Sequence, residues 1–176
     1  MLECVHSIYS ERPMRVFPRF LATIAVGFAM VCLLHGQEPV VSASNTEALF
    51  KSSDPTLQAN KMVVYGIYRD LLEAGHWELA DKYLTERYLQ HNPNAASGRA
   101  GVVAYFTQVL KVKPKPIAST LKSEIVAVLA ENDLVTVLSV SHLKDKNGAP
   151  YTTTWSDTWR MKDGKADEHW DSALKQ

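Results

Sequence analysis

The residues best suited to chemistry lie near the C-terminus, in the stretch TWSDTWRMKDGKADEHWD. Asp157, His169 and Asp171 form a dense set of titratable side chains there. The large aromatic residues among them are Trp155, Trp159 and Trp170. A carboxylate beside an imidazole in an apolar wall can move protons to and from a ligand. The alternative is an ordinary cross-strand pair on a solvated sheet, which contributes about 0.2–1 kcal/mol to stability.

The turn between the two halves of this stretch decides which side chains meet. A three-residue loop over 162–164, closed by Gly164 in the left-handed conformation, would set Asp157 opposite His169. A two-residue turn, Asp163-Gly164, would set Asp157 opposite Trp170 and turn His169 to the other face. The three-residue loop is favoured because it collects the candidate side chains on one face of the sheet. These are Trp155, Asp157, Trp159, His169 and Asp171.

The most secure predicted helix comes early in the chain. Asp54 is a typical N-cap, Pro55 suits the first helical position, and Gly75 ends the apolar pattern. The apolar residues at helical spacing between them are Val64, Ile67, Tyr68, Leu71 and Leu72. The polar, unpatterned residues 44–53 before this helix are predicted to be a linker.

Two further helices are predicted, with a short extended piece between them. One spans about 76–84, and the other is capped by Ser97 and ends near Pro114. The extended piece is YLQHNP, residues 88–93, which Pro93 closes. All three helices precede the residues suited to chemistry.

From Ile117 onward the apolar pattern changes from helical to extended. Four segments rich in β-branched and aromatic residues follow, separated by Glu-Asn-Asp, Asn-Gly and Asp-Gly turn signals. They are TLKSEIVAVLA, LVTVLSVSHLK, TTTWSDTWRM and ADEHWDSA. Three helices followed by a meander of antiparallel strands predict a single α+β domain over residues 54–176.

The N-terminal residues 1–43 have the pattern of a signal peptide. Three arginines precede the uncharged run FLATIAVGFAMVCLL, and the small residues Val41-Ser42-Ala43 predict cleavage after Ala43. The protein is therefore expected to be exported, to the periplasm or outside the cell. An uncleaved membrane anchor is less favoured, because the run is shorter than the roughly 20 residues that span a bilayer. Met14 is a second candidate start, which would make residues 1–13 a start-site artefact.

Composition excludes several classes of partner and site. The 176 residues carry 19 basic and 19 acidic side chains, so nothing points to binding of nucleic acid or, after cleavage, of an anionic membrane. Both cysteines, Cys4 and Cys32, lie in the predicted signal peptide. The remaining chain then has no disulfide and no cysteine-based metal site.

His91 and Asn92 form a second group of candidate residues. His91 is predicted to reach a ligand pocket, although its ring could instead fix the loop before Pro93. Asn before Pro is also an ordinary turn former. Donor atoms for a metal occur at His91, His142, Asp157, His169 and Asp171. None shows a metal-binding spacing such as HxxxH or HExxH, so no metal site is predicted.

Two blocks of the sequence resemble the SnoaL-like polyketide cyclase family, within the nuclear transport factor 2-like (NTF2-like) superfamily. They are YLQHNPNAASGRAGVVAYF, residues 88–106, and DTWRMKDGKADEHWD, residues 157–171. The resemblance extends over residues 57–173. It implies a curved antiparallel sheet wrapped by helices into a cone with an internal pocket, often dimeric through the sheet. It also implies chemistry without metal or organic cofactor, and pocket residues His91, Asn92, Asp157, His169 and Asp171.

These observations lead us to expect a cofactor-independent enzyme that acts on a small, apolar carbonyl compound. Asp157 is the expected general base or acid, His169 sets its charge, and His91 holds the substrate oxygen. The residues expected to bind the substrate are Asn92, Trp155, Trp159 and Asp171. Two alternatives share the same fold: a module that binds a small molecule without chemistry, and a domain whose sheet mediates dimerisation.

Overall fold

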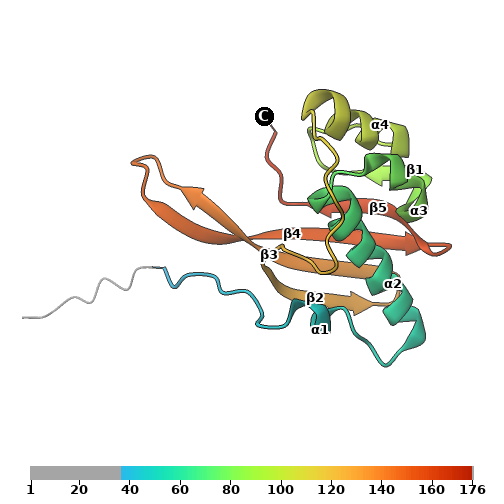
Figure 1. Ribbon diagram of the computed structural model, residues 1–176, viewed down its shortest axis with the longest axis horizontal. Coiled ribbons are helices and arrows are strands. Elements are labelled where there is room, and N and C mark those ends of the chain that lie inside the picture. Colours follow the sequence, from blue (N-terminus) through green and yellow to red (C-terminus); the bar gives the residue numbers. More distant parts are fainter. Residues whose placement is uncertain (1–36, 176) are drawn as a thin grey trace, which may run out of the picture. The chain divides into compact units, whose positions relative to one another are not determined.

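The computed structural model describes residues 37–175, which form an α+β domain built on a curled, unclosed sheet of five strands (Figure 1). Helix α2 crosses one face of the sheet, and α3 and α4 lie beside its β1 edge (Figure 1). The strands, in the spatial order β1-β5-β4-β3-β2, are β1 (Leu84–Gln90), β2 (Ile125–Glu131), β3 (Leu134–Lys144), β4 (Pro150–Lys162) and β5 (Lys165–Asp171). The α-helices are α1 (Thr46–Leu49), α2 (Pro55–Gly66), α3 (Ala80–Tyr83) and α4 (Arg99–Ala104). The predicted α+β class is confirmed.

The first predicted helix is confirmed at both ends. The Asp54 carboxylate accepts hydrogen bonds from the backbone N–H groups of Thr56 (2.8 Å) and Leu57 (2.9 Å). Beyond α2 the chain continues as a π-helix through Glu73, and Gly75 follows with a φ of 74°. Most of the predicted apolar face of this long helix belongs to the core that it shares with the sheet, but Leu72 is 37% exposed.

The second and third predicted helices differ from the structure at their ends. The second is a single 3₁₀ turn followed by α3, and Leu84, predicted as its last residue, already begins β1. The third begins after Gly98, whose φ is 88°, and not after Ser97. The predicted Ser97 cap is wrong because the Ser97 hydroxyl accepts a hydrogen bond from the Gln90 backbone N–H instead (3.0 Å). A π-helical segment, Tyr105–Val109, completes this helix.

The four predicted strands form the expected antiparallel meander, but the sheet has a fifth member. The predicted antiparallel sheet is thus confirmed for β2 to β5, and β1 adds one parallel pair that was not predicted. Strand β1 covers the first part of the piece predicted only as extended, and it pairs with β5 in parallel. Gln90 lies beside His169 in this pairing. The parallel pairing brings the first sequence block next to the last one.

The turn after β4 has two residues, and neither predicted register holds at the site. Asp163 and Gly164 have positive φ angles of 50° and 74°, the pattern of a type I′ turn. The pairing then shifts by one residue, because Asp167 forms a bulge in β5. As a result His169 lies opposite Trp159, and Asp157 lies opposite Asp171. The two-residue turn alone would have put His169 on the face opposite Asp157, and the bulge returns it to the same face.

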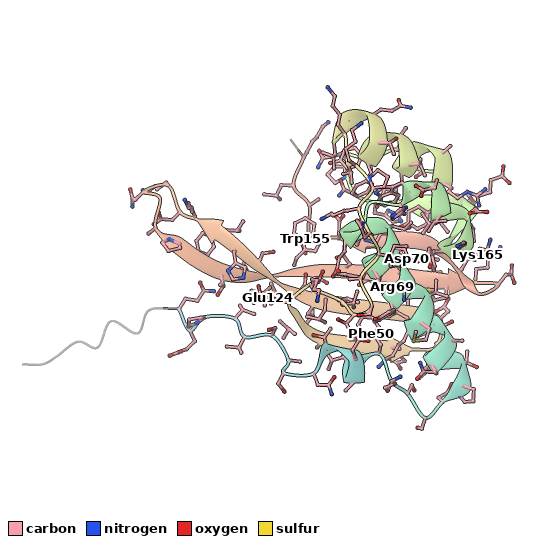
Figure 2. All side chains as sticks on the ribbon, in the orientation of Figure 1. Phe50, Arg69, Asp70, Glu124, Trp155 and Lys165 are labelled. Atoms are coloured by element: carbon pink, nitrogen blue, oxygen red, sulfur yellow. The ribbon has the colours of Figure 1, made fainter. Side chains whose placement is uncertain are left out.

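Residues 44–53 are a packed part of the domain, so their prediction as a linker is wrong. They include the short helix α1 and Phe50, which is only 1% exposed. The Phe50 ring, labelled in Figure 2, meets the ring of Tyr65 edge-on at a centroid distance of 5.2 Å. The hydrophobic pattern of the sequence could not predict that Phe50 is buried, because a single aromatic residue in a polar segment forms no periodic pattern.

Most of the predicted signal peptide lies outside the described residues. Within the described part, the Ala43 backbone N–H donates to the Ile125 carbonyl (2.8 Å), and the Val40 N–H donates to the Thr152 hydroxyl (2.7 Å). Cleavage after Ala43 remains a prediction. Between residues 37 and 175, no helix is long and apolar enough to cross a membrane.

The bulge residue Asp167 links β5 to β1 and makes stability depend on pH. Its buried carboxylate accepts hydrogen bonds from the Thr85 hydroxyl (2.7 Å) and from the Arg87 guanidinium. The Arg87 guanidinium holds the pKa of Asp167 below its usual value. Because the pKa of Asp167 is lower in the folded protein, its carboxylate stabilises the fold at pH values above the unfolded-state pKa of about 3.9. This stabilisation is lost as the pH falls through the pKa of the folded state.

We expect Asp167→Asn to be less stable than the wild type at neutral pH, with a difference that shrinks as the pH falls below about 4. Urea unfolding at neutral and acidic pH measures this difference. Asp81→Asn, at an exposed carboxylate, is the control and should show no such trend. A difference between wild type and Asp167→Asn that stays constant over the pH range would contradict the assignment.

Candidate active site

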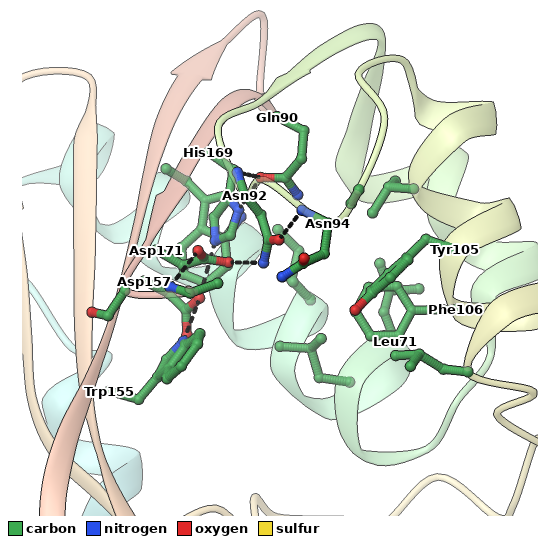
Figure 3. Close-up of a pocket in the computed structure, with 18 of the residues that line it drawn as sticks. Leu71, Gln90, Asn92, Asn94, Tyr105, Phe106, Trp155, Asp157, His169 and Asp171 are labelled. Atoms are coloured by element: carbon green, nitrogen blue, oxygen red, sulfur yellow. Dashed lines mark hydrogen bonds and ion pairs between the residues drawn. The ribbon is translucent and has the colours of Figure 1, made fainter. Parts of the chain in front are cut away.

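A cavity of about 640 Å³ lies between the sheet and the helices (Figure 3). One wall is polar and is formed by β4, β5, the end of β1 and the residues that follow β1 and β5. The labelled residues of this wall are Gln90, Asn92, Asn94, Trp155, Asp157, His169 and Asp171. The opposite wall is apolar and includes Leu71, Tyr105 and Phe106. The cavity therefore sets a polar group of side chains against an apolar one.

Asp157 and His169 are in contact at the centre of the polar wall. The distance from Asp157 Oδ1 to His169 Nε2 is 3.0 Å, and the two residues are only 8% and 6% exposed. The predicted pair is thus present, although the two residues are diagonal neighbours and not directly opposite. The face predicted for Trp155, Asp157, Trp159, His169 and Asp171 is also confirmed, since all five line the cavity.

Two further donors reach the Asp157 carboxylate. The Tyr68 hydroxyl donates to Oδ2 (2.8 Å), and the Trp155 indole N–H donates to Oδ1 (3.2 Å). A carboxylate has about four acceptor sites. With His169 counted, three are occupied, and one remains for a ligand in the cavity.

Tyr68 is a functional neighbour that sequence reasoning placed only in the core. Burial, followed by the negative charge of Asp157, raises the pKa of its hydroxyl well above the ordinary value. The hydroxyl therefore stays protonated and acts as a donor to Asp157 throughout the physiological range. Helical spacing correctly indicated that Tyr68 faces inward. It could not indicate which strand residue the hydroxyl would meet.

His169 is enclosed by aromatic rings and by a glutamine. Its Nδ1 lies 2.8 Å from the Gln90 side-chain oxygen. The Trp159 ring packs against the imidazole at a centroid distance of 4.9 Å, and its indole N–H donates to the Tyr88 hydroxyl (3.1 Å). Trp159 is therefore mainly a wall of the site, whereas Trp155, which is half-buried, contacts the carboxylate directly. Sequence reasoning missed both Gln90 and Tyr88.

Asn92 and Asp171 form the far side of the polar wall. The Asn92 amide donates to Asp171 Oδ2 (2.6 Å), and the Ala173 backbone N–H donates to Asp171 Oδ1 (3.0 Å). The Asn94 backbone N–H donates to the Asn92 side-chain oxygen (2.9 Å). Asn92 lines the cavity as predicted, and it also ties the loop after β1 to the end of β5.

His91 does not reach the cavity, so its predicted position in the pocket is wrong. Its Nε2 lies 2.9 Å from Glu168, and its ring stacks on Trp170 with a centroid distance of 5.1 Å. Both partners belong to the outer face of β5, opposite His169. The backbone explains the difference, because successive residues along an extended chain point to opposite faces. Gln90 points inward, and His91 points outward.

Three of the possible metal ligands come together in the structure. Asp157, His169 and Asp171 each offer one ligand atom, and these atoms lie within 4.8 Å of one another. They meet through the strand pairing, which a local spacing rule does not detect. The donors from Tyr68 and Trp155 already use Asp157 lone pairs that a metal would need. The expectation of no metal remains a prediction. His142 lies elsewhere, 2.6 Å from Glu124.

Several solved structures are similar to the chain at low sequence identity. The chain is similar to a putative polyketide cyclase from Acidithiobacillus ferrooxidans, with 16% identity, a TM-score of 0.50, and coverage of 69% of this chain and 89% of that one. It is also similar to a putative SnoaL-like polyketide cyclase from Jannaschia, with 15% identity, a TM-score of 0.49, and coverage of 69% and 91%. An NTF2-like protein from Burkholderia pseudomallei shows 16% identity, a TM-score of 0.48, and coverage of 64% and 88%.

Comparison of sequences decides the family. No curated protein matches the chain. A profile of the SnoaL-like domain, however, matches residues 66–169, which is more than half of the chain. The matched region includes β1, the π-helical segment with Tyr68, β4 with Asp157, and β5 as far as His169. The chain therefore belongs to the SnoaL-like domain family, as the resemblance of the two sequence blocks predicted.

Proposed function

We propose that the protein is a cofactor-independent enzyme that transfers protons on a small, largely apolar carbonyl compound. The observation that carries the proposal is the 3.0 Å contact between Asp157 and His169 in the wall of a cavity of about 640 Å³. Small-molecule sites commonly have about 300–1,000 Å³. A buried carboxylate that keeps one acceptor site for a ligand is suited to act as a general base.

The proposed reaction begins with Asp157 as the base. The C–H bond next to the substrate carbonyl breaks, its proton forms an O–H bond on Asp157, and its electron pair becomes that of an enolate. In a ring closure, the enolate carbon attacks a second carbonyl carbon of the same molecule. The new alkoxide oxygen then takes the proton back from Asp157. Atoms and electrons balance within the substrate, so no oxidant or reductant is needed.

The walls of the cavity suggest an apolar ligand. Trp77 and Phe106 stack on one another with a centroid distance of 3.9 Å, and both line the cavity. Leu71 and Trp159 add further apolar surface. A site that excludes water strengthens the electrostatic interactions within it. His91 has no part in this proposal, because its side chain lies on the outer face of the sheet.

The proposal is tested with β-tetralone, an apolar bicyclic ketone with acidic hydrogens next to its carbonyl. The full chain is incubated with it in heavy water, and deuterium incorporation is followed by NMR. Saturable catalysis of the exchange would support an enzyme. Saturable quenching of tryptophan fluorescence without exchange would contradict proton transfer and support the ligand-binding alternative. Export and homodimerisation remain predictions.

A further inference from the structure

The side-chain oxygen of Gln90 has two neighbours that together define its chemistry. The Asn92 backbone N–H lies 3.0 Å from it, and His169 Nδ1 lies 2.8 Å from it. A backbone N–H can only donate a hydrogen bond. The atom that faces both neighbours must therefore be the carbonyl oxygen of the amide. Rotating the amide by half a turn would set its NH₂ group against the N–H of Asn92.

An oxygen acceptor at this place determines the proton on the imidazole. A carbonyl oxygen cannot donate, so His169 Nδ1 must carry the hydrogen in their contact. We propose that Gln90 is a positioning residue that holds His169 with its proton on Nδ1, so that Nε2 is the atom that shares a proton with Asp157. Asn92 supports this arrangement, because its N–H fixes the orientation of the Gln90 amide.

The proposed tautomer fixes the number of protons that the Asp157–His169 pair holds. Nε2 and Oδ1 are 3.0 Å apart, and two lone pairs would repel at that distance, so one proton lies between them. Without Gln90, a neutral imidazole would place its only proton on Nε2, where the carboxylate accepts it. With Gln90, the pair holds the Nδ1 proton and one shared proton. When Asp157 takes a proton from the substrate, the pair becomes positively charged and offsets the negative enolate.

The catalytic meaning of this inference rests on the proposed function, but the position of the proton does not. It can be read from the full chain without a ligand, with isotope-labelled histidine and proton–nitrogen correlation spectra. The sequence has 6 histidines, and the His169 signals are assigned by their loss in His169→Gln. We expect Nδ1 to be protonated in the wild type. A wild-type spectrum in which Nδ1 lacks a proton would overturn the inference, whatever any variant does.

Two substitutions test whether Gln90 is the cause. Gln90→Met has a similar shape but no oxygen acceptor, so Nδ1 should lose its proton and the imidazole should keep only the proton on Nε2. Gln90→Glu keeps the acceptor and should keep the proton on Nδ1. Gln108→Met, at an exposed position, is the control and should leave the spectrum unchanged. A Gln90→Met spectrum with the proton still on Nδ1 would overturn the role of Gln90. If β-tetralone is not turned over but Nδ1 is protonated, only the proposed function fails.

Discussion

Replacement of Asp157 by asparagine is expected to slow proton exchange on β-tetralone about 10²–10⁴-fold, the usual contribution of a general base. Asparagine has nearly the same shape, and its side-chain oxygen can still accept a hydrogen bond from Tyr68. It cannot take a proton from the substrate. The rate of deuterium incorporation measures the effect, and tryptophan fluorescence shows whether the ligand still binds.

Asp163→Asn is the matched control for this substitution. It makes the same chemical change in the same hairpin, at the exposed turn, where asparagine tolerates the observed φ of 50°. Its exchange rate should equal that of the wild type. An Asp157→Asn protein that keeps the full rate would remove Asp157 as the base. Asp171→Asn would then be the next variant to measure, because Asp171 shares the polar wall.

The second large effect concerns stability. Phe50→Ala is expected to lower the free energy of unfolding by about 3–5 kcal/mol, the usual cost of removing a buried aromatic side chain from a core. Phe50 is 1% exposed and lies against Tyr65 of α2. The loss would therefore loosen the contact between α2 and the segment that leads into it. Urea unfolding followed by circular dichroism measures the change.

Val109→Ala is the control for Phe50→Ala. The Val109 side chain is 66% exposed, so its truncation should change stability by no more than about 0.5 kcal/mol. If Phe50→Ala were as mild as this control, residues 44–53 would behave as the linker that their composition predicts. The comparison thus decides whether residues 44–53 are a linker, as their composition predicts, or a packed part of the domain, as the structure shows.

Local signals in the sequence predicted much of the fold. An N-cap followed by proline marked the start of α2, and a glycine with positive φ marks the end of its continuation. Alternation and turn residues located the four strands of the meander. These features depend on neighbouring residues, so a single sequence contains them. The parallel pairing of β1 with β5 joins residues about 80 positions apart, and no local pattern specifies such a contact.

The site was predictable in composition but not in geometry. Asp157 and His169 were correctly predicted to share a face, although the predicted three-residue turn was wrong. The two-residue turn and the bulge at Asp167 together place the two side chains on the same face, as a three-residue turn would have done. His91 was expected inside because the resemblance of its sequence block implied a place in the pocket. Alternation along the extended chain selects Gln90 instead. The inward position of Tyr88, which is 4% exposed, places Gln90 on the same face, and the extended pattern alone did not show it.

The most direct test of the central claim is a crystal structure of the full chain with β-tetralone bound. We expect the ligand in the cavity, with the carbon next to its carbonyl roughly 3–3.5 Å from the Asp157 carboxylate, the distance of a reactive contact. The rings should lie against Trp77 and Phe106. A ligand bound with that carbon turned away from Asp157, or held outside the cavity altogether, would contradict the claim.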